Sequence, residues 1–300
     1  MDKNLIIGGA SNYGWNELKL WVFSIKKSGF SGDIVLVATN IKKETIDTLI
    51  EEGVNVVLYG KQDADGNIIA ENSTAPHVER FFHIWNYLRL NSDKYRFVIT
   101  TDTRDVIFQS DPVVYLQTLF EQNNIQNALV AAGEGLKYKD ESWNHTNFLS
   151  AFDPIVYDKI QHNEIFNVGV IAGTQKLVQD LLLLLYQLSI NRRINIVDQA
   201  VYNFIIQLQF CLQNVILLSN DSGWTTNLAT TIHAIRSGSG DIGQKNDPTS
   251  IILYQTKYMA QQPDISDGVV YSHHTKLPSV IVHQYDRVTG LADEILKQYN

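Results

Sequence analysis

The sequence predicts an α/β fold in which helices cover both faces of a mainly parallel β-sheet. Short β-rich runs alternate with helix-like apolar patterns over the first hundred residues, as a parallel sheet requires. Hydrophobic residues make up 44% of the chain and charged residues 19%, enough to build a sizeable core. The length of 300 residues suits one large domain, and because no repeat or linker interrupts the chain we expect 1–300 to be a single domain.

The first half of the chain is a regular succession of strands and helices. Strands are expected at 4–9, 33–39, 54–60 and 96–102, and helices at 16–29, 42–53 and 77–91. Gly53 should end the second helix, because glycine readily takes the left-handed conformation that follows a helix. A polar stretch from Lys61 to Pro76 comes before the third helix. This succession is the basis for predicting a parallel sheet.

The second half of the chain is less regular. Strands are expected at 127–135, 165–174, 214–219 and 278–286, and helices at 175–189 and 196–210. The pair Asp111-Pro112 indicates a turn. Polar surroundings at 141–148 and 222–227, and the glycine-rich run 237–249, are typical of loops.

Composition limits the classes of partner. The formal net charge is −8 and no basic run stands out, which argues against a nucleic-acid partner. A negatively charged small molecule would need a local cation, either a metal ion or a few arginines and lysines. The N-terminus lacks the apolar core of a signal peptide, and the most hydrophobic run, Leu177–Leu188, is too short to span a bilayer. We therefore expect no transmembrane segment and a cytoplasmic location.

Two carboxylates end the strand at 96–102. The strand-forming residues Val98–Thr101 run straight into Asp102, and Asp105 follows three positions later. Ligands bind beyond the carboxyl ends of the strands in such sheets, and carboxylates are costly to desolvate without a cation. Mn²⁺ and Mg²⁺ prefer oxygen ligands and keep positions open for phosphates, so the pair suggests a metal that bridges the protein to a phosphorylated ligand. The alternative is structural: one aspartate caps a turn and the other pairs with Arg104 or Lys94.

Three other segments carry polar residues at positions where a ligand could bind. His283 ends an apolar strand and could complete a Mn²⁺ site, although an isolated histidine is more often structural. Asn167 and Gly169 enter a strand, and the glycine either allows close approach of a ligand or marks a bend. Asp198 and Gln199 begin a helix, where an aspartate also complements the helix dipole.

The order of these motifs resembles a known family. The motifs are, in sequence, Ala10-Ser11-Asn12-Tyr13, Tyr87-Leu88-Arg89-Leu90, Asp102 to Asp105, Asn167-Val168-Gly169-Val170, Asp198-Gln199 and His283. They span most of the chain. In this order they resemble the GT-A-fold nucleotide-sugar glycosyltransferases, and most closely the retaining group that contains glycogenin and the bacterial lipopolysaccharide galactosyltransferases.

The resemblance implies a fold, a donor and a role for each motif. The fold would be of GT-A type, Rossmann-like, with a nucleotide-sugar-binding half at 1–110 and an irregular acceptor-binding half at 111–300. The donor would be a nucleoside-diphosphate sugar, with a UDP-sugar favoured and a GDP-sugar possible, and the acceptor a carbohydrate. The candidate donor-binding residues are Ala10, Asn12, Tyr13, Arg89, Asp102, Arg104, Asn167 and Gly169. Asp102, Asp105 and His283 would hold Mn²⁺ or Mg²⁺, and Asp198 and Gln199 would be catalytic.

The chain departs from the family pattern in two places. The family motif is Asp-x-Asp, whereas this chain has Asp-Thr-Arg-Asp, which puts Thr103 in the place of the first aspartate unless the turn bulges and lets Asp102 serve. Asp105 is therefore the firmer metal ligand, and Arg104 either touches phosphate or pairs with a carboxylate. The family's Gly-x-x-Lys-Pro-Trp segment after the late histidine is missing. The candidates to replace its phosphate-binding lysine are Lys257, Arg236 and Arg287.

The function we infer is a metal-dependent, retaining glycosyltransferase. Exposed aromatic rings would stack on an acceptor sugar, and the candidates in loop-like surroundings are Trp143 and Trp224; Trp21 and Trp85 fit helical apolar patterns and are expected in the core. One alternative is a non-catalytic nucleotide-sugar or carbohydrate-binding protein. Another is an aspartyl phosphatase of the haloacid-dehalogenase type, in which Asp102 would become phosphorylated.

Overall fold

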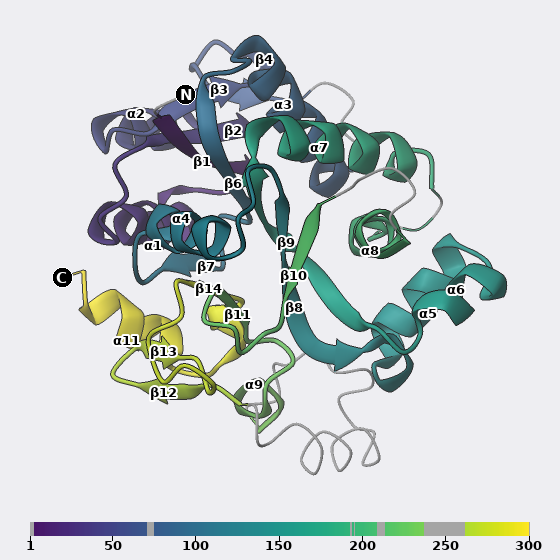
Figure 1. The fold of residues 1–300 in the computed structure, drawn as a ribbon. Coiled ribbons are helices and arrows are strands. Elements are labelled where there is room, and N and C mark those ends of the chain that lie inside the picture. The colour runs from purple at the N-terminus through teal and green to yellow at the C-terminus, as the bar shows by residue number, and fades with distance from the viewer. Residues whose placement is uncertain are drawn as a thin grey trace.

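The structure is a computed structural model that describes residues 3–70, 75–192, 194, 196–208, 214–236 and 262–299. Its centre is a seven-stranded sheet in the order β10-β8-β9-β6-β1-β2-β3 (Figure 1). These strands are β1 (Lys3–Ser11), β2 (Asp33–Thr39), β3 (Asn55–Leu58), β6 (Tyr95–Thr101), β8 (Leu129–Lys137), β9 (Glu164–Thr174) and β10 (Val215–Leu218). Only β9 is antiparallel to its neighbours in this sheet, which confirms the prediction of a mainly parallel α/β sheet.

Helices cover both faces of this sheet because its strands are apolar on both sides. In β1 the buried side chains alternate: Leu5 and Ile7 pack into one hydrophobic cluster, and Ile6 packs into the other. The first cluster contains α3 (Pro76–Leu90), α7 (Gln175–Ser189) and α8 (Asp198–Leu208). The second contains α1 (Trp15–Lys27), α2 (Lys43–Glu51) and α4 (Pro112–Gln122). Gly53 follows α2 with a φ of +82°, so the predicted stop is confirmed.

A second, three-stranded sheet attaches the C-terminal part of the chain. It consists of β7 (Val106–Phe108), β14 (Ile281–His283) and β11 (Thr225–Asn227), in the order β11-β14-β7. Because β7 follows Asp105 directly and Val106 pairs with His283, this sheet brings a late histidine to the end of β6. The short helices η3 (Tyr285–Arg287) and α11 (Leu291–Lys297) follow β14.

Two stretches that look loop-like in the sequence are helices. Asp111-Pro112 does not form an isolated turn: the Asp111 carboxylate accepts a hydrogen bond of 2.9 Å from the Val113 amide and caps α4, with proline at its first position. The polar stretch around Trp143 forms α5 (Ser142–Ala151), which is capped by the buried Glu141. The expectation at Asp111-Pro112 was wrong because this pair is common both in turns and at helix starts, and the one at 141–148 was wrong because α5 buries few apolar side chains.

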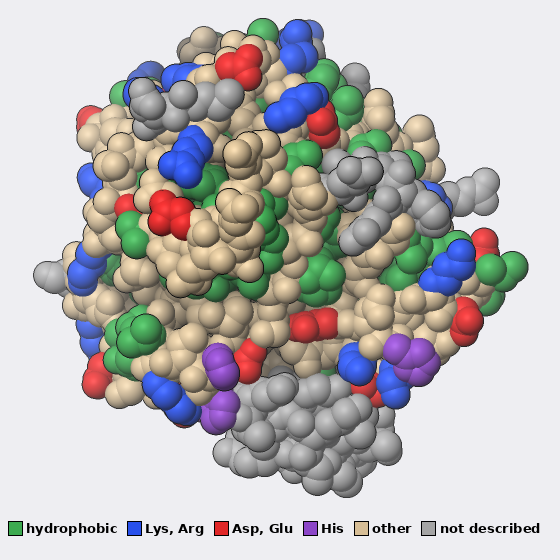
Figure 2. All heavy atoms as spheres, in the orientation of Figure 1, with side chains coloured by type: hydrophobic (Ala, Val, Ile, Leu, Met, Phe, Trp, Pro, Cys, Tyr) green, Lys and Arg blue, Asp and Glu red, His purple; other side chains and the backbone are tan. Residues whose placement is uncertain are grey.

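The remaining elements are short. They are β4 (Lys61–Gln62), β5 (Ile68–Ile69), η1 (Tyr138–Asp140), α6 (Pro154–Ile160), α9 (Ile232–Arg236), β12 (Asp264–Ser266) and β13 (Val269–Tyr271). The predicted loop at 237–249 lies outside the described residues. Among the helices that the structure describes, none combines the length and the apolar character needed to cross a membrane. On the face seen in Figure 2, acidic and basic side chains are scattered among one another.

Candidate functional site

A pocket of about 430 Å³ opens where the carboxyl ends of β1 and β6 meet β9. Its walls come from seven segments of the chain, and its lining includes Gly9, Tyr13, His77, Arg80, Asp102 to Asp105, Trp143, Asn167 to Gly169, Ile196, Asp198, Gln199, His283, Gln284 and Arg287. The backbone amide of Asp102 donates a hydrogen bond of 2.8 Å to the Gly169 carbonyl, which joins the end of β6 to β9. The pocket therefore collects most of the residues that the sequence motifs single out.

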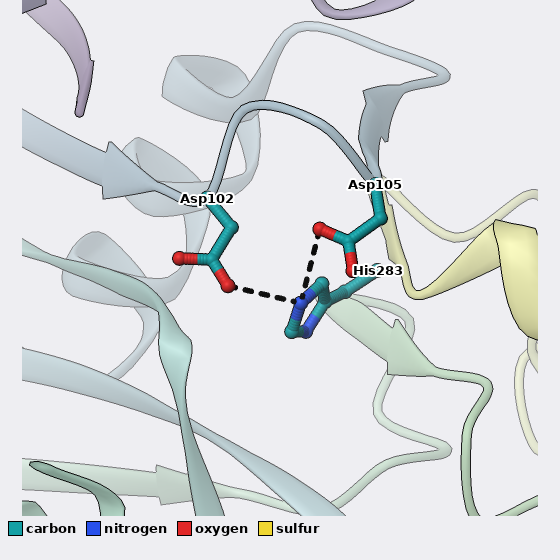
Figure 3. Close-up of side chains that lie close together, drawn as sticks. All are labelled: Asp102, Asp105 and His283. Carbon is teal, nitrogen blue, oxygen red and sulfur yellow. Dashed lines mark ion pairs between the residues drawn. The ribbon is translucent and has the colours of Figure 1, made fainter. Parts of the chain in front are cut away.

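Asp102, Asp105 and His283 form a compact cluster in this pocket (Figure 3). The His283 Nε2 atom lies 3.5 Å from Asp102 Oδ2 and 3.8 Å from Asp105 Oδ1, and one ligand atom from each residue lies within 4.8 Å of the other two. Two carboxylate oxygens and one imidazole nitrogen are a donor set that suits Mn²⁺ or Mg²⁺. The residues therefore fit the divalent cation that the sequence predicts.

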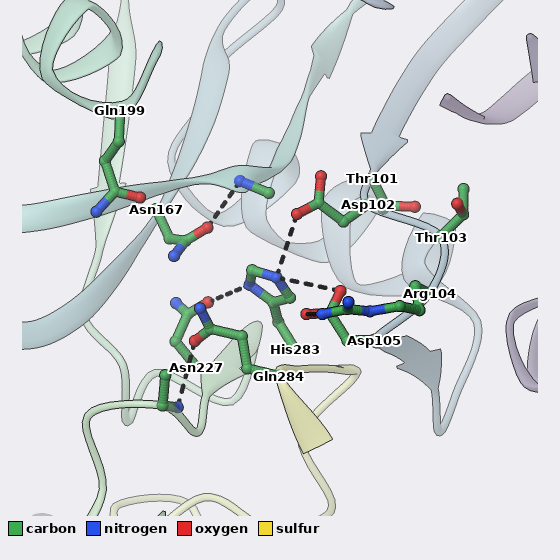
Figure 4. A network of polar contacts seen from close by, with 12 residues as sticks. Thr101, Asp102, Thr103, Arg104, Asp105, Asn167, Gln199, Asn227, His283 and Gln284 are labelled. Carbon is green, nitrogen blue, oxygen red and sulfur yellow. Dashed lines mark hydrogen bonds and ion pairs between the residues drawn. The ribbon is translucent and has the colours of Figure 1, made fainter. Parts of the chain in front are cut away.

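The orientation of His283 leaves Nε2 facing the carboxylates. Its Nδ1 lies 2.8 Å from the Asn227 side-chain oxygen (Figure 4). The Asn227 side-chain nitrogen donates a hydrogen bond of 2.8 Å to the Gly133 carbonyl. Asn227 thus accepts a hydrogen bond from the Nδ1–H group, an arrangement that orients the histidines of metal sites. A Cβ on Gly169 would lie 2.4 Å from His283 Cε1, so the glycine is needed for the imidazole to pack against β9.

The three groups of the cluster perturb one another electrostatically. Burial alone would raise the pKa of Asp102, but the Arg80 and His283 charges hold it below its ordinary value. Burial raises the pKa of Asp105, and His283 offsets this only in part. Burial alone would lower the pKa of His283, but the hydrogen bond to Asp102 and the charge of Asp105 raise it. The carboxylates thus favour a cation at Nε2.

Arg80, rather than Arg89, brings positive charge to the pocket. Arg80 is partly buried and pairs with Asp102, and its Nη2 lies 3.7 Å from Asp198 Oδ2. A Cβ on Gly9 would lie 2.9 Å from the Arg80 Cβ, so the end of β1 must be glycine here. Arg89 is exposed and donates to Asn86, so its predicted placement at the donor is wrong. The two arginines are nine positions apart, which is two and a half helical turns and puts them on opposite faces of α3.

The Asp-Thr-Arg-Asp turn places its residues differently from an Asp-x-Asp motif. The Thr103 hydroxyl is buried and donates 3.1 Å to the Gly9 carbonyl, away from the cluster. Asp102 and Asp105 both face His283, as expected if the turn bulges to let Asp102 serve. Arg104 reaches past Asp105, with 3.6 Å between Arg104 Nη2 and Asp105 Oδ2.

Sequence reasoning missed Glu134, a buried carboxyl group beside the catalytic candidates. Gln199 Nε2 donates 3.1 Å to Glu134 Oε1 and 2.8 Å to Asn144 Oδ1. The Asn167 amide also donates to Glu134 Oε1, at 2.7 Å. Both amide hydrogens of Gln199 are thereby used, so its Oε1 is the atom left to accept or to approach a ligand. A glutamate within an otherwise small and apolar strand, 129–135, was the one sequence signal for this role.

The buried Glu134 makes stability depend on pH. Burial raises its pKa to about 7 from an ordinary value of 4.5, despite the hydrogen bonds from Asn167 and Gln199. Between these two values the folded protein retains a proton that the unfolded chain has released, so the free energy of unfolding falls as pH rises. At about 1.4 kcal/mol per pKa unit, this group costs about 3 kcal/mol of stability at pH 8 relative to pH 4.

We therefore expect Glu134→Gln to flatten the decrease in melting temperature between pH 4.5 and 7, measured by thermal denaturation of both proteins. The variant keeps the shape of the side chain and removes its titration. Parallel curves for wild type and variant across this range would show that Glu134 titrates normally.

A smaller pocket of about 180 Å³ lies beside the first one, at the ends of β1 and β2. Ala10 and Tyr13, two of the candidate donor-binding residues, line it. Four of its lining residues have a buried polar side-chain atom without a hydrogen-bond partner in the described part of the chain, namely Thr39 Oγ1, His77 Nε2, Arg80 Nε and His83 Nδ1. Such atoms are costly unless a ligand or water satisfies them. The pocket is therefore suited to a polar ligand.

Asn12 lies at the rim of this smaller pocket and is not among its lining residues. It is exposed and takes a left-handed φ of +61°, and its backbone N–H donates a hydrogen bond of 3.2 Å to the Asn40 carbonyl. Of the candidates to replace the missing lysine, Arg287 lines the larger pocket. Lys257 and the Arg236 side chain lie outside the described residues.

The tryptophans divide between pocket and core. Trp143 is 39% exposed and lines the larger pocket together with Ile196. Trp224 is fully buried against Tyr115, with ring centroids 5.2 Å apart, so its predicted place in an acceptor site is wrong. Trp21 is in the core as predicted and donates to the Thr101 hydroxyl at 2.9 Å, whereas Trp85 is only partly buried.

Comparison with solved structures identifies the fold. A crystal structure of an active-site mutant of LgtC superposes with a TM-score of 0.53 and 12% identity, and covers 98% of this chain and 95% of that one. The galactosyltransferase LgtC in complex with donor and acceptor sugar analogs gives a TM-score of 0.51 and 12% identity, with 97% and 93% covered. The chain thus has the predicted GT-A-type fold. No protein-family profile and no curated protein sequence matches it.

Proposed function

We propose that this chain is a metal-dependent glycosyltransferase that moves a sugar from a nucleoside-diphosphate sugar to a carbohydrate or other hydroxyl acceptor with retention of configuration. The observation that carries the proposal is the convergence of Asp102, Asp105 and His283 in a pocket that also holds Gln199. The GT-A-type fold supports it, because galactosyltransferase LgtC shares that fold. Ligands of open α/β sheets bind at this carboxyl edge.

Asp102, Asp105 and His283 would hold Mn²⁺ or Mg²⁺ in this proposal. When bound, the divalent cation would act as a Lewis acid that neutralises charge developing on the departing diphosphate. Arg80 holds the Asp102 carboxylate in place and adds positive charge to the same wall of the pocket. The half of the chain at 1–110 would bind the nucleoside in the smaller pocket, with a UDP-sugar as the favoured donor.

Gln199 and Asp198 would act on the sugar. A retaining transfer passes through a positively charged, oxocarbenium-like anomeric carbon, which an amide oxygen stabilises. The hydrogen bonds from Gln199 Nε2 to Glu134 and Asn144 leave Gln199 Oε1 for that purpose. Asp198 is buried and lies 3.7 Å from Arg80, which would orient both groups toward the donor.

The competing phosphatase function is not supported by the site. That class of enzyme needs a nucleophilic aspartate after the first strand of the sheet, whereas Asp102 follows β6. Its carboxylate is paired with Arg80 and faces His283.

The most direct test is a panel of nucleotide sugars with Mn²⁺, scored by thermal shift and by slow hydrolysis of the donor. We expect one UDP- or GDP-sugar to raise the melting temperature and to be hydrolysed, and excess chelator to abolish both effects. Donor binding without hydrolysis or transfer to any acceptor would identify a non-catalytic binding protein. No response to any donor would refute the proposed activity.

Trp143 is the proposed contact for the acceptor. Its exposed ring and the neighbouring Ile196 give the pocket an apolar surface on which a sugar face can stack. Once an acceptor is found, we expect Trp143→Ala to raise the KM for that acceptor roughly 3- to 10-fold, since aromatic contacts contribute about 0.5–1.5 kcal/mol. The KM for the donor should not change. An unchanged acceptor KM would place the acceptor elsewhere.

A further inference from the structure

Two arginines border the larger pocket, one in each segment that carries the metal-binding side chains. Arg104 lies between Asp102 and Asp105 in the turn after β6. Arg287 lies four residues after His283, at the end of η3. Both side chains line the pocket. Each of the two segments that supply the metal-binding side chains therefore also places a positive charge at the pocket.

Asp286 joins the two guanidinium groups. Its Oδ2 lies 3.3 Å from Arg104 Nη2, and its Oδ1 lies 3.4 Å from Arg287 Nε. On its other side, Arg104 Nη2 lies 3.6 Å from Asp105 Oδ2 (Figure 4). The Asp286 carboxylate, which does not line the pocket, thus holds two guanidinium groups that do line it.

Hydrogen bonds to main-chain carbonyl groups fix the same two segments against each other. The backbone amide of Gln284 donates a hydrogen bond of 2.7 Å to the Asp105 carbonyl. The Tyr285 hydroxyl donates 2.7 Å to the Arg104 carbonyl. The backbones that carry the two arginines therefore stay in place even when the ion pairs to Asp286 open.

These ion pairs are weak enough to be exchanged for a ligand. The side chains of Arg104 and Asp286 are 44% and 36% exposed, and such pairs contribute roughly 0–1 kcal/mol. A diphosphate carries more negative charge than one carboxylate and offers more acceptor oxygens. Because the guanidinium fork matches phosphate geometry, the arginines can pass from Asp286 to phosphate oxygens.

We propose that Arg104 and Arg287, aligned by Asp286, clamp the diphosphate of the donor opposite Asp102 and Asp105. This inference rests on the proposed function, since it assumes a donor with a diphosphate. It gives Arg287 a binding role and makes Asp286 a positioning residue. It also makes phosphate recognition a property of two separate segments that pair only in the folded chain.

The test compares Arg104→Gln and Arg287→Gln with Arg89→Gln, an exposed arginine of the same helix as Arg80 that lies outside both pockets. Calorimetry with Mn²⁺ measures binding of UDP and GDP, and NMR titration measures binding of uridine and guanosine. We expect each clamp variant to lower affinity for the nucleoside diphosphate about 10- to 100-fold, as for lost charge-assisted hydrogen bonds. Affinity for the nucleoside should change less than about 2-fold, and Arg89→Gln should bind as wild type does.

The outcomes separate the clamp from the proposed function. If wild type binds a nucleoside diphosphate and both variants bind it equally well, the clamp is wrong and the transferase proposal stands. If the variants lose affinity equally for the nucleoside and for the nucleoside diphosphate, the arginines maintain the shape of the pocket and do not bind the phosphates. The same conclusion follows if the variants lose only Mn²⁺ binding, measured by electron paramagnetic resonance. Wild-type protein that binds neither UDP nor GDP overturns both proposals.

Discussion

Asp105→Ala should abolish metal-dependent donor binding and leave the fold intact. Asp105 is one of three ligands in the cluster, and altering even an outer contact of a metal site costs about 10- to 100-fold in affinity, so loss of a ligand should cost roughly 100-fold or more. The fold should survive, because the contact that Asp105 makes with Gln284 uses its backbone carbonyl. Calorimetry with Mn²⁺ and the nucleotide that wild type prefers measures the loss.

A matched control is Asp180→Ala, which removes an exposed carboxylate of α7 and changes the net charge equally. It should bind metal and donor as wild type does. Circular dichroism and the melting temperature of the metal-free proteins report on the fold. If the Asp105 variant binds the donor normally at the Mn²⁺ concentration used for the wild type, Asp105 is not a metal ligand.

Gln199→Ala should lower kcat by about 100- to 1,000-fold with little change in donor affinity. An oxygen that stabilises charge formed only in the transition state contributes to turnover rather than to ground-state binding, and loss of one such group typically costs that much. The structure supports this role, because Glu134 and Asn144 occupy the amide nitrogen of Gln199 and leave its oxygen for the sugar. Steady-state kinetics and donor calorimetry on the same preparation separate the two effects.

Gln207→Ala is the control for this variant, since Gln207 lies on the same helix and makes structural hydrogen bonds to Glu164 and Asn203. It should lower stability and leave the turnover of folded protein unchanged. Asn144→Ala removes one of the two acceptors that orient Gln199 and should lower kcat by a smaller factor. Equal losses of kcat and donor affinity in Gln199→Ala would assign Gln199 to binding.

Several parts of the candidate site follow from local patterns. A strand of period two that ends at Thr101 places Asp102 at the carboxyl edge of the sheet, whatever its neighbours are. A glycine within a predicted strand likewise indicates close packing, and Gly169 does permit the close approach of His283. The sequence could not predict that His283 is the residue packed against Gly169, because this contact depends on the pairing of β14 with β7.

Other residues were misplaced because their environment depends on packing. Arg89 and Arg80 look equivalent on α3, and only the packing of Phe81 and Leu88 into the core decides which arginine faces the pocket. Trp224 has polar neighbours in sequence, yet its ring meets Tyr115 from another helix. Sequence neighbours cannot report a contact made across the fold.

By itself the sequence determined the α/β class, the succession of strands and helices, and the position of the carboxylates at a strand end, because each depends on the spacing of apolar residues and caps along the chain. The tertiary structure alone decided that Arg80 and the Arg104–Asp286–Arg287 group lie beside those carboxylates and that Glu134 lies beside Gln199. The physical reason is that burial and charge act through space. Which side chains share a desolvated pocket is set by how helices rotate and which distant strands pair, and no local spacing encodes either.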